Sequence, residues 1–400
     1  MKKTLLFAAS LMVSVCSWAE WVKPAAPASA EMKPGEELYL YNQDADGFLC
    51  GANDYGTRAS VSPTLGHKVY IEQGTADGSY YITNYVLSGW MANQVGYMFM
   101  DNLEAIYVDN TKEGKTNNQY TLELQADGTY KIGLSEANAD LNPKNYPGAY
   151  LGLIPQKEDT RIYVCDPENE LGYQMSDCQL TWYFVAPSAY ELYVAAMKQY
   201  LAAVSLGKAI AEAEALEGVD AQALAEAKAV YGDTEATPEA LAAQQTALEE
   251  AMKNAKYNVA SVENPVEVLS LLGIATDFND GQFTGWTSTT GAQNKQASNG
   301  NNAKDFSITG NHYENWHWEA MSTGKVSASL NNLPKGVYHL NALAYTTTVG
   351  GTYLFAGTLQ KKVTSTQIDI EQPMDIYTVV TTGELEIGLD VQQKGTNWIG

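Results

Sequence analysis

One short segment of the chain gathers side chains that suit sugar recognition. If residues 313–318 form a strand, successive side chains point to opposite faces, so Glu314, Trp316 and Trp318 share one face. Indole rings stack on the C–H faces of sugar rings, and carboxylates accept hydrogen bonds from sugar hydroxyls. Tyr313 adds an aromatic ring on the opposite face. We therefore expect a ligand-binding site here, although large aromatic side chains equally fit the core of a sandwich.

A weaker set of candidate ligand-binding residues lies in a turn-rich stretch near the N-terminus. These residues are Asp44, Asp46, Tyr55 and Trp90. Residues 42–47 (NQDADG) have the oxygen spacing that opens a calcium loop, and such a loop takes a bidentate glutamate at its twelfth position. Asn53 stands at that position here. A hairpin turn explains the same residues, so calcium is the lesser interpretation and we expect no other cofactor.

Two of the four cysteines are close enough in sequence to form a disulfide. Cys165 and Cys178 flank a short segment. Cys50 stands alone, and Cys16 directly follows the N-terminal apolar run. Disulfides persist in oxidising compartments. Two small buried thiols fit the same sequence equally well. No CxxC pair or Cys/His group indicates a zinc site, so no metal is expected from these residues.

Signatures of the common catalytic machineries are missing from the sequence. The four histidines stand outside any HExxH pattern, and no GxSxG nucleophile motif occurs. Glycosidases use two carboxyl groups about 5–10 Å apart, a separation that sequence does not report. A chain with 47 acidic residues holds such pairs by chance. The prediction is therefore a non-catalytic protein.

The N-terminus has the three parts of an export signal. A charged start (MKK), an apolar run over residues 5–15 and the small residues of SWA at 17–19 predict a signal peptide over residues 1–19, cleaved before Glu20. The alternative is lipidation at Cys16, which the branched valine before it disfavours. We expect an exported protein that is extracellular or on the outer surface of a bacterial cell.

Hydropathy argues against a transmembrane segment in the mature chain, and charge argues against a nucleic-acid partner. Beyond residue 19, no stretch reaches the roughly 20 apolar residues that a membrane span needs, so the mature chain is expected to have no transmembrane segment. The chain has 24 basic and 47 acidic residues, a net charge of −23. Such a field repels the phosphate backbone, and nucleic acid is not expected as a partner.

The composition changes several times along the chain, which at 400 residues is long enough for two to four domains. Residues 20–36 are rich in Pro and Ala and predict a tether. From 37 to 187, short β-type runs alternate with turns rich in Gly, Asp and Asn. Three opening and three closing strands indicate a threefold repeat. The openings are ELYLYNQDADGFLCG, DGSYYITN and DGTYKIGL, and the closing runs are HKVYIEQ, QYTLELQ and LTWYFVA.

Two further regions follow. Alanine-rich sequence with helical periodicity occupies residues 188–258. Ser188 and Glu191 have the spacing of a capping box for a first helix, Asp220 opens a second, and a Thr-Pro-Glu run opens a third. Residues 259–400 return to alternating β-type runs typical of a sandwich. The chain stops at an expected closing strand, so this domain is predicted to be truncated.

A family resemblance is carried by LYLYNQDADGFLCGANDYGTRASV at 38–61 and by TWYFV at 181–185. With these runs, residues 37–187 resemble the β-trefoil modules of secreted Bacteroidota proteins, which are distantly similar to ricin-type lectins. Those lectins carry Gln-x-Trp in each repeat. Here Gln179 and Trp182 are separated by one residue too many. The resemblance therefore implies the fold more than it implies sugar binding by this module.

The remaining regions carry two further resemblances. The alanine-rich helical pattern of residues 188–258 resembles the FIVAR-type modules of bacterial extracellular proteins, which implies a helical spacer. The last region contains DFNDGQFTGW, YENW and LPKGVYHLNALAY. With these runs it resembles the galactose-binding-like β-sandwich that underlies many carbohydrate-binding modules.

The sequence thus predicts a multi-domain, mainly β protein. Its parts are a β-trefoil-like N-terminal domain (37–187), a three-helix spacer (188–258) and a galactose-binding-like β-sandwich (259–400). The favoured function is binding of a glycan or polysaccharide by aromatic stacking. Two alternatives stay open: a surface adhesin or structural protein that binds a cell-surface protein, and the accessory region of a glycosidase or peptidase whose catalytic domain lies beyond residue 400.

Overall fold

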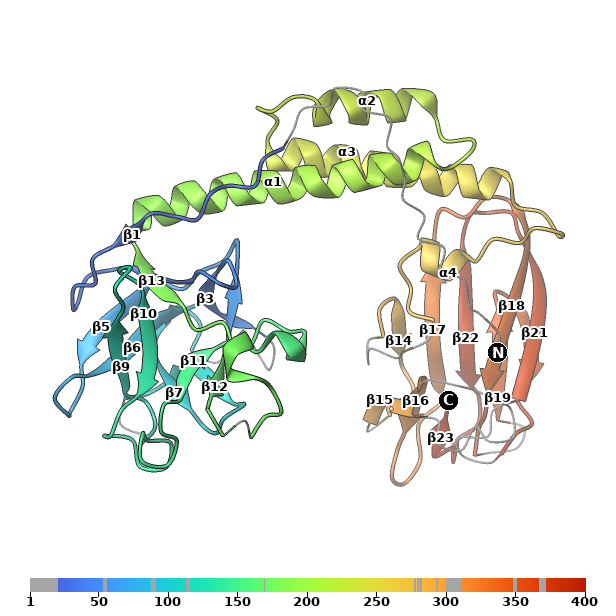
Figure 1. Cartoon of the computed structure of the whole chain (residues 1–400). Helices are drawn as coiled ribbons and strands as arrows, with labels where there is room; N and C mark the ends of the chain where they lie inside the picture. The colour runs from blue at the N-terminus through green and yellow to red at the C-terminus, as the bar shows by residue number, and fades with distance from the viewer. Residues whose placement is uncertain are drawn as a thin grey trace, which may run out of the picture. The chain divides into compact units, whose positions relative to one another are not determined.

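The computed structural model is a mainly β, multi-domain protein (Figure 1). It describes residues 21–52, 56–87, 91–112, 116–168, 170–276, 278, 283–292, 294–299, 311–347, 351–366 and 372–400. The chain divides into two compact units, Met1–Glu250 and Ala251–Gly400. Each unit is built around its own apolar core.

Twelve strands of the first unit pair in a pattern that recurs three times along the chain. The strands are β2 (Tyr39–Asn42), β3 (Gly47–Ala52), β4 (Arg58–Ser62), β5 (Val69–Gln73), β6 (Ser79–Val86), β7 (Gln94–Met100), β8 (Ile106–Asn110), β9 (Tyr120–Leu124), β10 (Tyr130–Leu134), β11 (Tyr150–Gly152), β12 (Tyr163–Cys165) and β13 (Trp182–Val185). In each set of four, the first three strands pair in succession. The fourth strand then pairs with the first of the next set, and β13 returns to β2.

This return to β2 closes the sheet around a shared core. The six predicted opening and closing segments are all strands here. Their inward side chains, among them Leu40, Ile82 and Trp182, are at most 1% exposed. Trp182 also donates its indole N–H to the carbonyl oxygen of Leu151 at 2.9 Å. Burial of one such large apolar side chain stabilises the folded state by about 1.5–3 kcal/mol. A single set of four strands cannot bury these side chains, so all three sets are needed for this stabilisation.

The segment predicted as a tether is packed against the first unit wherever it is described. Within it, β1 (Ser29–Ala30) pairs with β13. Trp21 donates its indole N–H to the carbonyl oxygen of Tyr231 at 2.8 Å, and the hydroxyl of Tyr183 donates to the carbonyl oxygen of Pro27 at 2.9 Å. The prediction of a free tether is therefore wrong for residues 21–36. Composition indicated flexibility, but tertiary contacts hold the segment in place.

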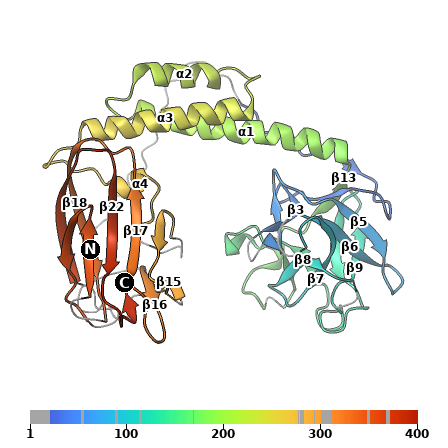
Figure 2. The ribbon, with the colours of Figure 1, turned by 180° about the vertical axis from the view of Figure 1, so that it is seen from behind.

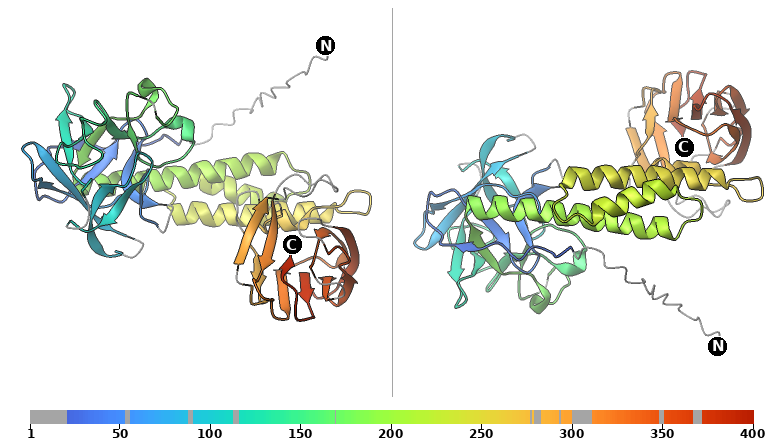
Figure 3. Two further views of the ribbon diagram at one scale, coloured as in Figure 1. Left: turned by 90° about the horizontal axis from the view of Figure 1, so that it is seen from below. Right: turned by 90° about the horizontal axis from the view of Figure 1, so that it is seen from above.

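Three long helices follow the closed sheet: α1 (Pro187–Glu214), α2 (Ala221–Tyr231) and α3 (Pro238–Asn258). Figure 3 shows α1, α2 and the start of α3 running side by side. Asp220 caps α2 by accepting the Ala223 N–H at 2.9 Å, as expected. Gly207 lies under the ring of Tyr231, where a Cβ would come within 2.8 Å of a ring carbon, so glycine permits the close packing of α2 on α1.

The predicted capping box at the start of α1 does not form. The helix begins two residues earlier than expected, with Pro187 at its first position and Ala186 as N-cap without a side-chain hydrogen bond. Proline suits this position because its φ is already helical and it lacks the N–H that a cap would satisfy. The start of α1 is therefore determined by Pro187 and not by Ser188 and Glu191.

An aromatic cluster joins α1 to the closed sheet. Tyr190 of α1 stacks on Tyr39 with ring centroids 3.6 Å apart and packs edge-on against Phe48 at 4.8 Å. Tyr193, one turn along, donates its hydroxyl to Asp46 Oδ1 at 2.6 Å. Tyr41 donates to the same oxygen, and the ammonium group of Lys23 pairs with the other. We call Lys23, Tyr41, Asp46 and Tyr193 the junction network.

The second unit has two layers. One layer is a sheet in the order β14 (Trp286–Ser288), β17 (Gly324–Leu330), β22 (Leu385–Val391), β19 (Thr352–Ala356) and β20 (Leu359–Lys362). The other contains β15 (Asn294–Asn299), β16 (Asn311–Trp316) and β23 (Trp398–Ile399), with β18 (Gly336–Ala344) beside β21 (Gln372–Val380). A short helix, α4 (Val268–Leu271), precedes them. Figure 2 shows the two layers from behind.

Backbone hydrogen bonds join the two parts of the second layer. The residues after β18 continue toward β23, where Tyr345 and Gly400 exchange N–H···O bonds of 2.9 and 3.4 Å and Thr346 forms a bridge with Ile399. The order β15–β16–β23–β18–β21 is therefore continuous. Leu354, Met374 and Ile387 pack between the layers and are at most 3% exposed.

The junction network predicts how acid affects the first unit. Burial alone would raise the pKa of Asp46, but hydrogen bonds from Lys23, Tyr193 and Tyr41 outweigh it and hold that pKa below its usual value. A carboxylate with a lowered pKa stabilises the fold above its ordinary pKa, and this contribution is lost as the pH falls through the lowered value. Asp46→Asn should therefore cost about 2 kcal/mol of unfolding free energy at pH 7, and much less near pH 3.

Urea unfolding of the first-unit transition at the two pH values tests this expectation. Asp77→Asn is the matched control, because Asp77 is an exposed turn residue of the same unit. Equal losses for the two variants at pH 7 would show that Asp46 does not hold the junction.

Candidate functional site

The second layer of the second unit has one face turned away from the core. Along β18 the side chains alternate between partly buried and exposed, and Val337, His339, Asn341 and Leu343 are the exposed ones. Antiparallel pairing places Val379, Tyr377, Asp375 and Pro373 directly opposite them on β21. Residues directly opposite in such a ladder project to the same side. Four cross-strand pairs thus line the outer face of this layer.

The two middle pairs form a compact polar and aromatic group. The rings of His339 and Tyr377 are stacked, with centroids 4.2 Å apart and planes 2° from parallel. Asp375 Oδ1 lies 2.8 Å from His339 Nε2 and accepts a hydrogen bond of 2.9 Å from the amide of Asn341. Tyr377 remains 64% exposed. We call His339, Asn341, Asp375 and Tyr377 the outer-face cluster.

Electrostatics keep the carboxylate of this cluster ionised. The hydrogen bond from Asn341, followed by that from His339, lowers the pKa of Asp375 below its usual value. Asp375 is therefore a hydrogen-bond acceptor at neutral and mildly acidic pH. The cluster offers an anionic acceptor, an amide and an exposed ring within two adjacent pairs.

The sequence-predicted segment lies in the same layer, and Glu314 and Trp316 share one face of β16 but differ in burial. Trp316 points outward and stacks on Trp398, its partner across β16 and β23, with centroids 5.2 Å apart. Glu314 is 3% exposed and accepts a hydrogen bond of 3.1 Å from the hydroxyl of Tyr345. Gly400 lies between Glu314 and Tyr345 in the sheet. Because glycine has no side chain, the hydroxyl of Tyr345 can reach the carboxylate of Glu314.

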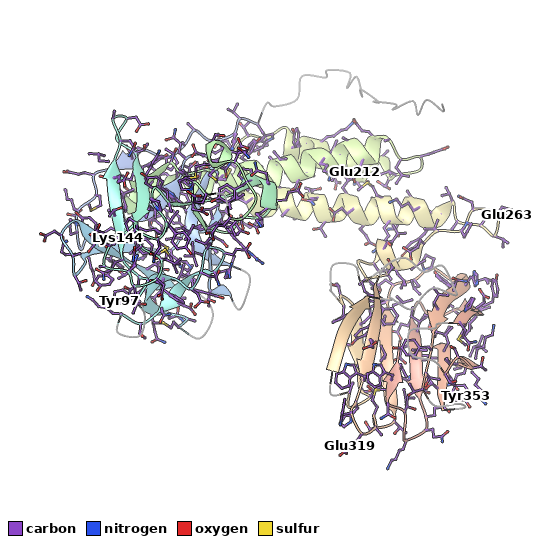
Figure 4. The ribbon with its side chains drawn as sticks, turned by 60° about the horizontal axis from the view of Figure 1, so that its bottom comes forward. Tyr97, Lys144, Glu212, Glu263, Glu319 and Tyr353 are labelled. Carbon is purple, nitrogen blue, oxygen red and sulfur yellow. The ribbon has the colours of Figure 1, made fainter. Side chains whose placement is uncertain are left out.

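Tyr313 lies on the opposite face of β16, as the strand pattern predicts, whereas Trp318 lies beyond the strand. Tyr313 points toward the interior, where its ring stacks on Phe283 at 4.3 Å and burial raises the pKa of its hydroxyl. β16 ends at Trp316, so Trp318 lies in the following turn and is 77% exposed. His317 caps that turn, because its Nδ1 accepts the N–H groups of Glu319 and Ala320 at 3.1 and 3.2 Å. Figure 4 labels Glu319 in this turn.

The expectation that Glu314, Trp316 and Trp318 share one strand face is thus wrong at its last residue. The strand does not extend far enough to include Trp318. Trp316 still points outward, but it pairs with Trp398 from the end of the chain. That partner is more than eighty residues away, so local alternation could not identify it.

The weaker N-terminal set is occupied by contacts within the protein. Asp44 accepts the Thr181 N–H at 2.9 Å, and Asp46 belongs to the junction network. Asn42 Oδ1 accepts the Ala45 N–H at 2.8 Å, the contact expected of a tight turn. Across the described ranges, no group of three or more His, Cys, Asp or Glu side chains could hold a metal ion. Tyr55, Trp90 and Asn53 lie outside the described residues.

Sequence reasoning missed the outer-face cluster. A short signal was present in HLNA at 339–342 and in MDIY at 374–377, where polar or aromatic residues alternate with apolar ones. Alternation predicts which side chains face outward. It does not predict that these two segments pair, and only that pairing brings His339 and Tyr377 together.

Cys165 and Cys178 belong to one small buried cluster. Both thiols are free in this structure, Cys165 buried and Cys178 partly exposed. Contact with Cys178 raises the pKa of Cys165, and the same contact lowers the pKa of Cys178. Cys50 is buried elsewhere in the first unit. The fold therefore places the two predicted partners side by side in reduced form.

Comparisons with known proteins were made for the whole chain. No protein-family model matches it, and no curated protein matches it. Among solved structures, a CBM61 module in complex with β-1,4-galactotriose is similar at 18% identity and a TM-score of 0.27, covering 31% of this chain and 88% of that one. A GH43 β-1,3-galactosidase gives 12% and 0.28, covering 42% and 33%.

A bacterial toxin is also similar to this chain. The cytolethal distending toxin of Haemophilus ducreyi gives 16% identity and a TM-score of 0.27, covering 40% of this chain and 89% of that one. TM-scores in this range carry no argument about function. In the described part of the chain, none of the helices is both long and apolar enough to cross a bilayer.

The neighbouring thiols lead to a prediction. After oxidative refolding of residues 20–400, we expect a Cys165–Cys178 disulfide, visible as a cross-linked peptide by mass spectrometry. Reduction should lower the unfolding free energy of the first unit by about 3 kcal/mol, because the cross-link restricts a short loop in the unfolded chain. Cys178→Ser should abolish both effects, while Cys50→Ser should leave both intact. A cross-link to Cys50, or none at all, would contradict the pairing.

Proposed function

We propose that this chain is an exported, non-catalytic glycan-binding protein and that the outer-face cluster contacts the sugar. The observation that carries the proposal is the placement of exposed Tyr377 directly beside Asp375 and Asn341. A sugar ring needs an apolar surface for its C–H face and polar groups for its hydroxyls. The cluster supplies both from adjacent cross-strand pairs.

Each member of the cluster has a distinct role in this proposal. Tyr377 presents its ring for stacking, and His339 holds that ring upright by packing flat against it at 4.2 Å. Asp375 accepts hydrogen bonds from sugar hydroxyls, and charge-assisted bonds of this kind are stronger than neutral ones. Asn341 and His339 hold the carboxylate in place. Preorganised groups lose less conformational entropy when a ligand binds.

The shape of the outer face suits an extended ligand. Its four cross-strand pairs follow one another every second residue, or about 7 Å along the strands. Trp316 and Trp398 stack on each other in the same layer, on β16 and β23. A glycan chain lying along this layer would meet apolar, aromatic and polar pairs in turn. Binding of a glycan or polysaccharide is therefore favoured over binding of a compact metabolite.

The charges of the cluster favour sugar over a protein partner. Val337, Leu343 and Val379 are exposed apolar side chains on the same face, which suits a surface adhesin that binds protein. However, the centre of the face carries a carboxylate, and burial of a charge in a dry interface is costly. Sugar hydroxyls instead donate directly to that carboxylate. Protein binding is thus the second candidate.

The carboxylate chemistry also supports a non-catalytic role for this face. A general acid in a glycosidase needs a raised pKa so that it carries a proton near neutral pH. Asp375 has a lowered pKa instead. Asp375 therefore does not fit the role of the general acid and fits that of a hydrogen-bond acceptor.

The remaining parts of the proposal concern the domains. The three recurring sets of four strands support a β-trefoil module for the first unit. The two-layered second unit supports a galactose-binding-like sandwich, and the three long helices support a spacer. The signal over residues 1–19 lies outside the described residues, and export to the outside of a bacterial cell is proposed from the sequence alone.

Binding to a glycan array tests the proposed function. We expect residues 20–400 to bind at least one polysaccharide above background. Tyr377→Ala should weaken that binding at least tenfold because the stacking surface is lost, and Asp375→Asn should do the same because the charged acceptor is lost. Trp318→Ala is the matched control, since it removes an aromatic ring that is even more exposed than Tyr377 from a turn outside the cluster.

Two outcomes would decide against this site. If the parent binds no glycan but retains a protein in a cell-surface extract through Tyr377, the adhesin candidate replaces the proposal. If Trp318→Ala abolishes glycan binding and Tyr377→Ala does not, the site moves to the turn after β16. Unfolding midpoints of the variants should match the parent, because the substituted side chains are exposed.

A further inference from the structure

The first unit contains a polar depression that is distinct from the outer-face cluster. It has a volume of about 530 Å³ and lies where the β3–β4, β7–β8 and β11–β12 hairpins meet. Arg58 of β4 pairs with Tyr107 of β8, and Ser60 forms a bridge with Arg161 before β12. One hairpin from each of the three recurring sets therefore contributes to the wall. This volume lies in the range of small-molecule sites.

The charge of this depression differs from that of the chain. Three basic side chains, Arg58, Lys157 and Arg161, line it together with three acidic ones, Asp101, Glu104 and Asp159. The chain as a whole carries a net charge of −23. A locally balanced site in such a protein repels an anion far less than the surrounding surface does.

Most polar groups in the wall are already organised by the protein. Arg58 is 6% exposed, donates to the carbonyl oxygen of Glu104 and lies over the Tyr107 ring at 5.1 Å from its centroid. Lys157 pairs with Glu104 at 3.3 Å. The hydroxyl of Tyr163 donates to Asp159 Oδ2 at 2.6 Å. These contacts hold the wall rigid around the depression.

Arg161 also lines this wall. Its Nε lies 3.8 Å from Asp159 Oδ2, beyond hydrogen-bond distance, and this buried nitrogen has no hydrogen-bond partner among the described residues. Its side chain is 35% exposed. A buried polar group left without a partner is costly. Arg161 nevertheless lines the depression with a side chain that stays partly exposed, so it is available to an anionic ligand there.

We propose that this depression binds a small carboxylate that also carries hydroxyl groups, such as a uronic acid, with the carboxylate on Arg161. A planar guanidinium fork matches a carboxylate with two parallel hydrogen bonds. Asp101 and Asp159 then accept hydrogen bonds from the hydroxyls. The Tyr107 ring, already covered by Arg58, forms part of the apolar wall.

Three sugars of the same ring size and different charge test the site: glucuronate, glucose and glucosamine. Isothermal titration of residues 20–400 should give an affinity for glucuronate at least tenfold higher than for glucose or glucosamine. Arg161→Gln should lower the glucuronate affinity at least tenfold, to the level of glucose. Arg161→Lys should also weaken it, because a point charge replaces the fork.

Matched variants separate this site from general charge effects and from the proposed function. Lys144→Gln removes one positive charge from an exposed position of the same unit, labelled in Figure 4, and should leave glucuronate binding unchanged. Tyr377→Ala should leave it unchanged as well, so the two sites can fail independently. Equal loss in Lys144→Gln and Arg161→Gln, or preference for glucosamine, would overturn the proposal. So would unchanged glucuronate affinity in Arg161→Gln.

Discussion

The register between β18 and β21 is the constraint on which the proposed glycan site depends. Nine consecutive residue pairs hold it, from Gly336 opposite Val380 to Ala344 opposite Gln372. Because side chains alternate, a slip of one residue in β21 would turn Met374 and Ile376 toward solvent and bury Asp375 and Tyr377. The packing that forms the core thus also keeps the polar and aromatic side chains outside. The buried core side chains and the exposed binding side chains therefore depend on the same strand pairing.

In the first unit, closure of the sheet has a comparable role. No set of four strands buries its apolar side chains alone, so the three sets stabilise one another around a shared core. Closure also brings the three hairpins together and creates the depression lined by Arg58 and Arg161. The junction network then fixes α1 to this sheet through the Asp46 carboxylate. The charge of Asp46 is tolerated because hydrogen bonds and Lys23 compensate for its burial.

The two proposed sites use polar groups in the same way. Asp375 is held by Asn341 and His339, and Asp159 is held by the hydroxyl of Tyr163. In both sites the protein fixes the acceptor before a ligand arrives, so less ordering is required on binding. They differ in shape, since the outer face is elongated whereas the depression is a local hollow of about 530 Å³. An elongated face suits a chain of sugars, and a local hollow suits a single terminal group.

The sequence alone determined the local elements of this protein. The opening and closing strands of the first unit and the Asp220 cap of α2 follow from periodicity and turn chemistry, which act over a few residues. Tertiary structure decided the rest. It turned Tyr313 inward, paired Trp316 with Trp398, packed residues 21–36 against the first unit and joined β18 to β21. These outcomes depend on packing between segments distant in sequence, where burial and cross-strand contacts outweigh local propensity.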